Sequence, residues 1–455
     1  MDAFTGQLWD RLPLAAATLT LFDHMFDDSR LKAIYDAHRG RCHDRHLKFQ
    51  TLLRLVRDAL LQHGGSGHAM YIELERAQAH PADESSFYRK LANMPVDVSR
   101  ALLRECTPAV RDLMAPTMSL PTCFDDMTAV VLDGKKIKNA AKRLAPTRGY
   151  SGRLLGAKAL VALDVRRGLA LAMSDSLDGE ANDVPLVPQV LPQVREVIAE
   201  AVLWLADRQF GDTTTLGRLA DRPGDHFVVR VRKNLQFQCE TCSTSTDAEG
   251  RTVTDEVGVL GSGASSMRVR RVTLHRDDDP VQLVTDLMDE ARYSADDLLA
   301  LYRERWAIER VFQEVTETFN LKHLIGCQPR AILFQFAFCL LMYNLVQAIK
   351  SFVADAGAVA TAWASTRRLF YDIKRELTTW AYLTDGRYDR RRFTTAQMRA
   401  YLRDQLRDAW DPIAHRKARD ANPRPPRQQA KTLPGGHTSV QRLIEQKGAA
   451  KATAQ

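Results

Sequence analysis

The stretch TAVVLDGKKI at residues 128–137 decides the fold, together with VLWLADRQFGD at residues 202–212. Each contains a short apolar run that closes on an aspartate, Asp133 in the first and Asp207 in the second. Continuous apolar runs of this length predict strands buried on both faces. An acid at the carboxyl end of a central strand lies where α/β folds place their sites. The alternative for each aspartate is an ordinary turn residue.

Further strands and helices are predicted on either side of these two runs. Segments 156–165 and 168–177 have the composition of two strands joined by a tight turn, and 226–234 of another. Helices are predicted over 184–201, in spite of internal prolines, and over 213–222. Strands followed by strand–helix alternation predict an α/β fold with a mixed sheet flanked by helices.

Changes in composition divide the chain into predicted domains. Residues 1–118 have helical periodicity and are predicted to form an all-helical domain. Residues 119–410 form the predicted catalytic domain, interrupted by a β-rich insertion at 236–294, where Ser, Thr, Gly and Asp are frequent. Residues 411–455 combine a Pro-rich segment with excess Lys and Arg, which predicts a basic flexible tail.

The helical domain is rich in basic residues, which permits two interpretations. A DNA-binding domain and an ordinary helical domain with solvated basic faces are equally compatible with the pattern. The residues concerned are Arg39, Arg41, Arg45, Lys48, Arg54, Arg57, Arg89 and Lys90.

Composition narrows the class of protein. A formal net charge of +8 and a pI of about 9.1 favour a polyanionic partner, nucleic acid first. Seven cysteines without framework spacing, and an N-terminus without a basic start before its apolar run, indicate a cytoplasmic protein. The apolar stretch 331–349 contains Gln335, Asn344 and Gln347, so we expect a buried core helix and no membrane partner. No phosphate-binding G-x-x-x-x-G-K-S/T loop is present, so no nucleotide cofactor is expected.

A third acid lies on a helix predicted over residues 296–319. A polar stripe follows one side of this helix at helical spacing, formed by Tyr302, Arg305, Glu309, Gln313 and Thr316. A stripe of this kind is usually a solvated face, but here it lies within a broadly apolar helix. Two strand-end carboxylates placed side by side repel each other unless a cation lies between them. With Glu309 they would suit a pair of Mg²⁺ ions that promote phosphodiester displacement.

Cationic and polar neighbours of the three acids are candidates for DNA contacts. Arg305, one turn from Glu309, is placed to bind a phosphate, and Tyr302 to stack on or hydrogen-bond a DNA end. Lys135 follows Asp133 and would line the DNA path, the alternative being a solvated basic loop. Arg208 follows Asp207 and would hold a phosphate or form a surface ion pair.

Three motif blocks give the chain a specific resemblance. VVLDG at Asp133, LADRQFGD at Asp207 and YRERWAIE at Glu309 resemble the DDE transposases of bacterial insertion sequences, in the insertion-sequence-four group. The similarity covers roughly residues 80–350. It implies a ribonuclease-H-like core, a β-rich insertion between the second Asp and the Glu, and Asp133, Asp207 and Glu309 as catalytic and metal-binding residues.

One position departs from the family pattern. The signature is Tyr, two residues, Arg, three residues, Glu, six residues, then Lys or Arg; its first three members match Tyr302, Arg305 and Glu309. The last falls on Thr316, which can hydrogen-bond a phosphate but carries no charge. Either Lys322 or another basic residue takes the place of the missing Lys or Arg, or the protein binds DNA ends more weakly.

The resemblance implies a mobile-element enzyme of the bacterial cytoplasm, associated with the nucleoid. Such an enzyme cleaves DNA at terminal inverted repeats and transfers the 3′-hydroxyl into target DNA, using Mg²⁺ or Mn²⁺. It implies double-stranded DNA partners, both transposon ends and target, and a homodimer that pairs two ends. The alternatives are a catalytically silent transposon-derived DNA-binding protein and a ribonuclease-H-like nuclease without strand transfer.

Overall fold

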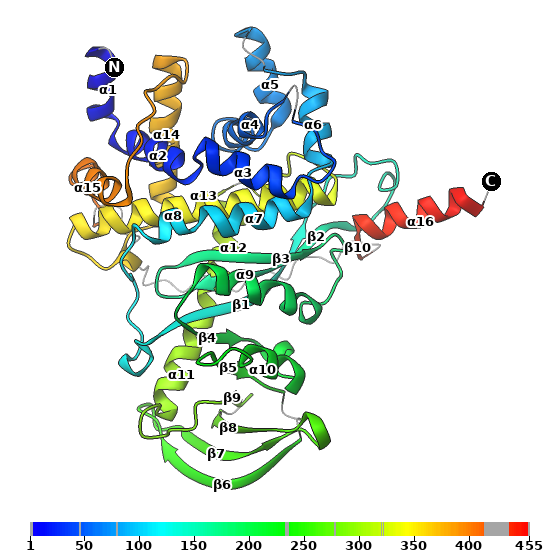
Figure 1. The fold of residues 1–455 in the computed structure, drawn as a ribbon, viewed down its shortest axis with the longest axis vertical. Helices are drawn as coiled ribbons and strands as arrows, with labels where there is room; N and C mark the ends of the chain where they lie inside the picture. Colours follow the sequence, from blue (N-terminus) through cyan, green and yellow to red (C-terminus); the bar gives the residue numbers. More distant parts are fainter. Residues whose placement is uncertain are drawn as a thin grey trace.

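The molecule consists of a helical layer, a central sheet and a β-rich extension of that sheet (Figure 1). The structure is a computed structural model, and it describes residues 3–44, 47–78, 81–232, 236–276, 279–319, 321, 323–413 and 436–453.

Five strands form the central sheet in the order β3-β2-β1-β4-β5. Strands β1, β4 and β5 are parallel, whereas β2 runs antiparallel to both β1 and β3. This is the ribonuclease-H-like arrangement, so the predicted fold class is confirmed. The strands are β1 (Met127–Lys138), β2 (Arg153–Asp164), β3 (Leu169–Ser176), β4 (Ala201–Ala206) and β5 (His226–Arg230).

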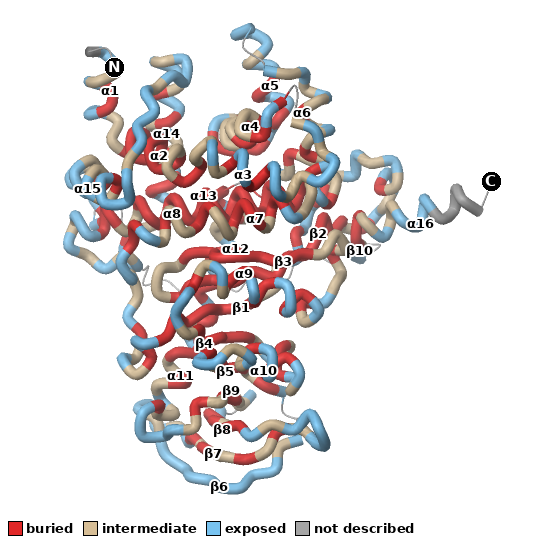
Figure 2. Tube along the Cα trace, viewed as in Figure 1, coloured by how far each residue is buried: buried red, intermediate tan, exposed pale blue. Residues whose placement is uncertain are grey.

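Helices cover both faces of this sheet, which explains why most residues of its strands are buried (Figure 2). Alternate residues of β1 point to opposite faces: Val131 joins the large core under the helical layer, and Val130 joins a smaller core on the other face. The smaller core is formed with α9 (Val187–Val197) and α10 (Thr213–Leu219). A 3-10 turn, η2 (Val184–Leu186), leads into α9, which continues through Pro192.

The chain begins with helices that pack on helices from its C-terminal half. The N-terminal helices are α1 (Ala3–Arg11), α2 (Pro13–Met25), α3 (Asp28–His38), α4 (Phe49–Leu61), α5 (Gly67–Arg76), α6 (Glu84–Ala92), α7 (Val96–Cys106) and α8 (Pro108–Arg111). Their partners are α13 (Pro329–Ala356), α14 (Thr366–Thr384) and α15 (Thr395–Gln405), with the 3-10 turn η6 (Thr361–Trp363) between α13 and α14. The predicted N-terminal helical region is therefore present, and it shares one continuous core with the later helices.

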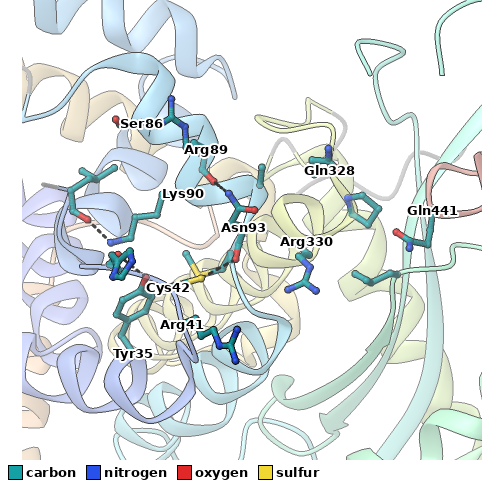
Figure 3. Close-up of a pocket in the computed structure, with 16 residues that line it drawn as sticks. Tyr35, Arg41, Cys42, Ser86, Arg89, Lys90, Asn93, Gln328, Arg330 and Gln441 are labelled. Carbon is teal, nitrogen blue, oxygen red and sulfur yellow. Dashed lines mark hydrogen bonds between the residues drawn. The ribbon is translucent and has the colours of Figure 1, made fainter. Parts of the chain in front are cut away.

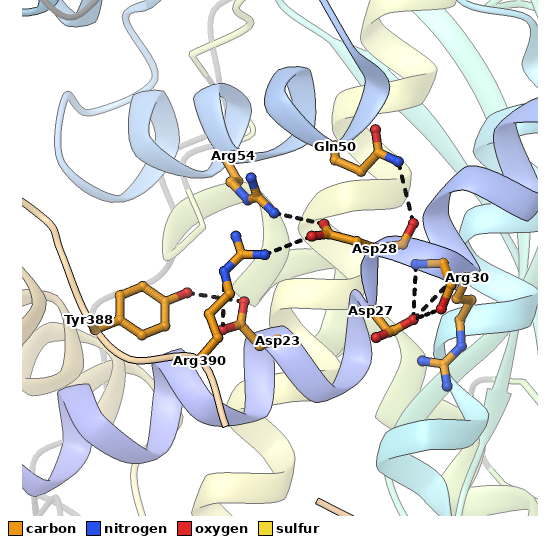
Figure 4. A network of polar contacts seen from close by, with 9 residues as sticks. Asp23, Asp27, Asp28, Arg30, Gln50, Arg54, Tyr388 and Arg390 are labelled. Atoms are coloured by element: carbon orange, nitrogen blue, oxygen red, sulfur yellow. Dashed lines mark hydrogen bonds and ion pairs between the residues drawn. The ribbon is translucent and has the colours of Figure 1, made fainter. Parts of the chain in front are cut away.

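Ion pairs also join the two ends of the helical layer (Figure 4). Asp28 at the start of α3 accepts from Arg54 of α4 and from Arg390, which follows α14, at 2.7 Å each. Tyr388 donates to Asp23 of α2 at 3.0 Å. These contacts connect the segment around residue 390 to α2 and α3.

Helix α13 is the apolar stretch that could be mistaken for a membrane span. It is the one described helix that is long and apolar enough to cross a membrane, and its most apolar part is entirely buried in the protein. Its polar side chains are used internally: Asn344 bonds the backbone of Ala170 in β3, and Gln335 bonds Ile325 and His323. The expectation of a buried core helix is confirmed.

The β-rich insertion extends the central sheet. Its strands are β6 (Phe237–Thr246), β7 (Thr252–Leu260), β8 (Met267–Leu274) and β9 (Val281–Thr285), with the 3-10 turn η4 (Gly263–Ser265). They form an antiparallel meander, and β9 pairs with β5, so the order continues as β5-β9-β8-β7-β6. A buried pair between Arg270 and Asp255 connects β8 to β7.

The single helix predicted over 296–319 is two helices with a tighter turn between them. They are α11 (Ala295–Arg303), the 3-10 turn η5 (Glu304–Trp306) and α12 (Ala307–Glu317). The predicted stripe is therefore not continuous: Tyr302 lies on α11, Arg305 in η5, and the other three members on α12. The 3-10 turn rotates α12 relative to α11, because it has three residues per turn instead of 3.6.

The prediction of a flexible tail over 411–455 is wrong for residues 436–453. Residues 414–435 lie outside the described residues, but β10 (His437–Ser439) pairs in parallel with the first residues of β2, and α16 (Val440–Thr453) follows. Ser439 is fully buried and bonds Gly179 and Glu180. Backbone pairing and this buried hydroxyl hold a segment whose composition alone resembles disorder. The predicted division into domains remains a prediction.

Candidate active site

Asp133 and Asp207 follow directly on the last paired residues of two neighbouring strands. Strands β1 and β4 are paired from Met127↔Ala201 to Leu132↔Ala206, so the next residue of each is an aspartate. Strand β1 itself does not end there, as the sequence suggested, because it continues to Lys138 paired with β2. The two carboxylates are therefore neighbours at the edge where the parallel ladder stops.

Local hydrogen bonds orient both carboxylates. The Gly134 N–H donates to Oδ1 of Asp133 at 2.8 Å. The Gln209 N–H donates to Oδ1 of Asp207 at 2.9 Å, which makes Asp207 the N-cap of the 3-10 turn η3 (Arg208–Phe210). Each carboxylate keeps its second oxygen available for another ligand.

Glu309 approaches the aspartates from the first turn of α12, and Arg305 lies between them. The Arg305 guanidinium is 3.8 Å from Oδ2 of Asp133 and 3.4 Å from Oε1 of Glu309. Its side chain is 10% exposed, and that of Glu309 is 42% exposed. Arg305 is thus a buried cation shared by two of the three candidate acids.

Burial dominates the electrostatics of Asp133. The pKa of Asp133 is raised to about 6, mainly because burial removes the carboxylate from solvent. The Gly134 amide and Arg305 lower this pKa, whereas the carboxylates of Asp207 and Glu309 contribute to raising it. The mutual influence of the three acids indicates that they share one environment. A single guanidinium does not compensate the burial of this carboxylate.

The donor set fits a divalent cation. Three carboxylates supply the hard oxygen ligands that Mg²⁺ and Mn²⁺ prefer, and added positive charge would relieve the burial of Asp133. Among the described residues, no three His, Cys, Asp or Glu side chains are already gathered around one metal position. In this structure Asp133 and Glu309 contact Arg305 instead.

Two aromatic rings flank Arg305. Its guanidinium carbon lies 5.8 Å from the ring centre of Tyr302 and 5.2 Å from that of Trp306. Burial raises the pKa of Tyr302 to about 12, so its hydroxyl keeps its proton at physiological pH. Trp306 is 59% exposed and offers an aromatic surface beside the site. The Nε of Arg305 is buried without a hydrogen-bond partner.

The remaining predicted DNA-contacting residues occupy different positions around the acids. Lys135 lies on β1, not in a loop, with its Nζ 5.4 Å from the Phe312 ring centre; burial lowers its pKa. Arg208 is exposed beside Asp207. Thr316 donates its hydroxyl proton to the Phe312 carbonyl at 2.6 Å, within α12. Lys322 lies outside the described residues.

A buried network behind the aspartates was missed by the sequence analysis. Lys158 of β2 lies 2.6 Å from Oδ1 of Asp183, and both side chains are 6% exposed. Oδ2 of Asp183 accepts from the Gln209 side chain at 2.7 Å, and the Gln209 backbone holds Asp207. A lysine inside the otherwise apolar run GAKALVALDV was the available signal, because a buried lysine needs a partner.

Gly134 connects this network to Asp133. A Cβ at Gly134 would lie 2.0 Å from Oδ1 of Asp183, so no other residue fits there without displacing the buried carboxylate. Asp183 therefore packs directly against the backbone next to Asp133, while its other oxygen is connected through Gln209 to Asp207. The two candidate aspartates share a common support.

Comparisons with known proteins show which proteins the chain is similar to. Residues 125–345 match the family described as the transposase DDE domain, a range that contains all three acids. A probable transposase for insertion sequence element IS5377 of Geobacillus stearothermophilus is 23% identical over 291 residues, 63% of this chain and 72% of the relative. A putative transposase for element IS4SA of Synechocystis sp. is 23% identical over 145 residues, 31% of this chain and 39% of the relative. The solved piggyBac transposase synaptic complex with hairpin DNA aligns over 86% of this chain and 85% of its own, with 12% identity and a TM-score of 0.36.

Proposed function

Because the chain belongs to the DDE transposases through its residues 125–345, we propose that it cleaves DNA at the terminal inverted repeats of an insertion sequence and transfers the 3′-hydroxyl ends into target DNA. The observation that carries the proposal is the position of Asp133 and Asp207 at the end of the paired β1 and β4, with Glu309 facing them. This donor set suits metal-assisted phosphodiester chemistry.

Asp133, Asp207 and Glu309 would hold Mg²⁺, or Mn²⁺ in its place. When bound, divalent ions activate the attacking oxygen and stabilise the leaving one. The protein fixes the carboxylates in position: Gly134 and Gln209 orient the two aspartates, and the buried pair of Lys158 and Asp183 supports both from behind. Little else is required, because phosphoryl transfer depends mainly on positioning and charge.

Arg305 would exchange its carboxylate contacts for a DNA phosphate when the acids take up metal. Its planar guanidinium suits bidentate phosphate binding, and it is held in place by Tyr302 and Trp306. Lys135 and Arg208 flank the aspartates and would contact the strand on either side. Thr316 would accept, not donate, a hydrogen bond, because its proton is used within α12. Lys322 is the last of the residues proposed to contact DNA.

The helical residues 1–118 would bind the transposon ends, and two copies of the chain would pair two ends as a homodimer. Double-stranded DNA is the partner on both sides of the reaction, as transposon end and as target. We place the protein in the bacterial cytoplasm, on the nucleoid. The high content of Lys and Arg supports these assignments, since phosphate contacts supply most of the affinity in sequence-independent DNA binding.

The test is nicking of a labelled duplex that carries the element's own terminal repeat, with Mg²⁺. We expect Asp133→Asn, Asp207→Asn and Glu309→Gln each to reduce nicking by about 100- to 1,000-fold or more, with DNA binding changed less than about threefold. Glu304→Gln is the matched control, because it removes the same charge from η5, five residues before Glu309. Equal losses in Glu304→Gln and Glu309→Gln would contradict the assignment.

A strand-transfer assay with pre-cut ends and a plasmid target distinguishes the other two functions. Nicking without joining indicates a ribonuclease-H-like nuclease. Binding of the repeat without nicking or joining indicates a silent DNA-binding protein.

A further inference from the structure

A pocket of about 930 Å³ lies between the helical layer and the N-terminal end of α13, outside the candidate active site (Figure 3). It is formed by the loop after α3, by α6, by residues at the start of α13, and by Leu177 and Gln441 from the sheet side. Its volume is at the upper end of the range for small-molecule and nucleotide-sized ligands. None of the three proposed catalytic acids lines it.

The lining of this pocket is cationic. Arg41, Arg89, Lys90 and Arg330 contribute to it, and none of its described lining residues is an aspartate or a glutamate. Lys90 is already engaged, because it lies 2.6 Å from Asp44 and 4.8 Å from the Tyr35 ring centre. That pair fixes the loop after α3 onto α6 and so builds one wall of the pocket.

Arg41, Arg89 and Arg330 are the cations left available. All three are exposed, and none has a carboxylate within ion-pair distance among the described residues. Figure 3 shows Arg41 and Arg330 at this pocket although they come from segments almost three hundred residues apart. Guanidinium groups that line one pocket without a counter-charge create a positive potential that favours an anion there.

The start of α13 adds to the positive potential. This helix has 28 residues, and its N-cap residue Gln328 makes no side-chain cap hydrogen bond. Gln328, Pro329 and Arg330 all line the pocket, so the positive end of the helix dipole lies beside the same space as the arginines.

We propose that this pocket binds the phosphate groups of a DNA strand, at nucleotides away from the position of cleavage. The inference rests on the proposed function and adds a second contact region to it, formed jointly by the N-terminal helices and α13. Phosphodiester groups match the combination of three exposed guanidiniums, a helix N-terminus and a lining without acids. Because α12 and α13 are consecutive helices, a strand held here would be connected through the protein to the helix that carries Glu309.

The experiment measures binding of the full chain to a fluorescent terminal-repeat duplex between 50 and 200 mM salt, conditions that reveal phosphate contacts. We expect the double variant Arg41→Ala/Arg330→Ala to bind about 10- to 100-fold more weakly and to show a salt slope shallower by about 1 to 2. The control Arg387→Ala/Arg403→Ala removes two exposed arginines outside residues 1–118 and should change affinity less than about threefold. Arg41→Lys/Arg330→Lys should keep most of the salt slope, because the charge remains.

Failure of this proposal is distinguishable from failure of the proposed function. If the wild-type chain binds and nicks the duplex, and the pocket variant binds it with unchanged affinity and slope, the pocket assignment is overturned alone. If the wild-type chain does not bind the duplex at all, the proposed function fails first. Stabilisation of the wild type by inorganic pyrophosphate in a thermal shift assay, lost in the pocket variant whose DNA affinity is unchanged, would assign the pocket to a free phosphate compound and overturn the DNA assignment.

Discussion

Asp133 carries its charge at a place that water reaches poorly. Its side chain is 16% exposed, and burial is the main reason why its pKa rises to about 6. Arg305 contacts it at 3.8 Å, too far to restore the lost hydration. The residue is therefore destabilising in its charged form unless further positive charge arrives, which is the condition expected of a metal ligand.

The pKa of Asp133 gives a pH dependence that can be measured in metal-free protein. The folded protein binds this proton up to about pH 6, whereas the unfolded chain releases it near the ordinary value of 3.8. The native state then binds more protons between these limits, so the stability contributed by Asp133 falls as pH rises from about 4 to about 6. In Asp133→Asn this loss is absent, and we expect its stability relative to wild type to increase by about 1–3 kcal/mol from pH 4 to pH 7.

Urea unfolding in EDTA at pH 4, 5, 6 and 7 measures this difference. Asp404→Asn, on an exposed position of α15, is the control and should follow the wild-type curve. Parallel curves for Asp133→Asn and wild type would show that the carboxylate is not penalised by burial.

Single residues also show how far the sequence could predict the site. Asp133 and Asp207 end apolar runs, and Glu309 follows Tyr302 and Arg305 at a recognisable spacing, so all three could be selected without coordinates. Asp183 could not, because it lies in a polar segment with several other acids, and its burial arises only when it meets Lys158 of β2. Its pairing is a product of tertiary structure.

At the scale of elements, strand β1 is longer than its apolar run. The sequence suggested an end at Asp133, since Gly134, Lys135 and Lys136 resemble a turn. Pairing with β2 continues to Lys138, because the partner strand provides backbone hydrogen bonds whatever the side chains are. The extension places Gly134 against Asp183 and Lys135 against α12. The sequence did not predict the 3-10 turn between α11 and α12 either, because the residues of this turn are good helix formers.

The substitution Gly134→Ala tests whether Asp183 holds Asp133 and Asp207 in position. In Gly134→Ala the new Cβ would lie 2.0 Å from Oδ1 of Asp183, which is held on both sides by Lys158 and Gln209. We expect destabilisation of about 1–3 kcal/mol and a loss of nicking larger than the loss of folded protein explains.

The matched control is Gly217→Ala in α10, where an added Cβ has no atom within 4 Å. It should stabilise the chain by about 0.5–1 kcal/mol, because alanine is the better helix former. Chemical denaturation gives both values. Similar stabilities of the two variants would show that Asp183 moves away without cost.

At the scale of the whole molecule, the helical layer is a single packed body. Phe26, directly after α2, stacks on Phe338 of α13 at 5.8 Å between ring centres, Phe49 of α4 meets Phe334, and Trp9 meets Trp380 of α14. The sequence identified helices at both ends of the chain but could not show that they pack on each other, since apolar periodicity does not name a partner. For the same reason it did not predict that β9 joins β5.

Phe338→Ala is expected to weaken both ends of the chain together. Removing this fully buried ring leaves a cavity between α13 and α2, which should lower the free energy of unfolding by about 3–5 kcal/mol. Hydrogen exchange should then increase in α2 to α4 as well as in α13, with one cooperative transition. Phe4→Ala, at a ring that is 53% exposed, should change stability by less than about 0.5 kcal/mol. Increased exchange confined to α13 would mean that residues 1–118 fold independently.

The docking of β10 beside β2 has a consequence for how the chain is made. Strand β2 emerges from the ribosome long before β10, because the two strands lie far apart along the chain. Until β10 has been made, the first residues of β2 beyond β3 lack their neighbour and present unpaired backbone groups. Completion of the central sheet therefore waits for the synthesis of β10, and a product truncated before β10 would carry the proposed catalytic residues on a sheet with an open edge.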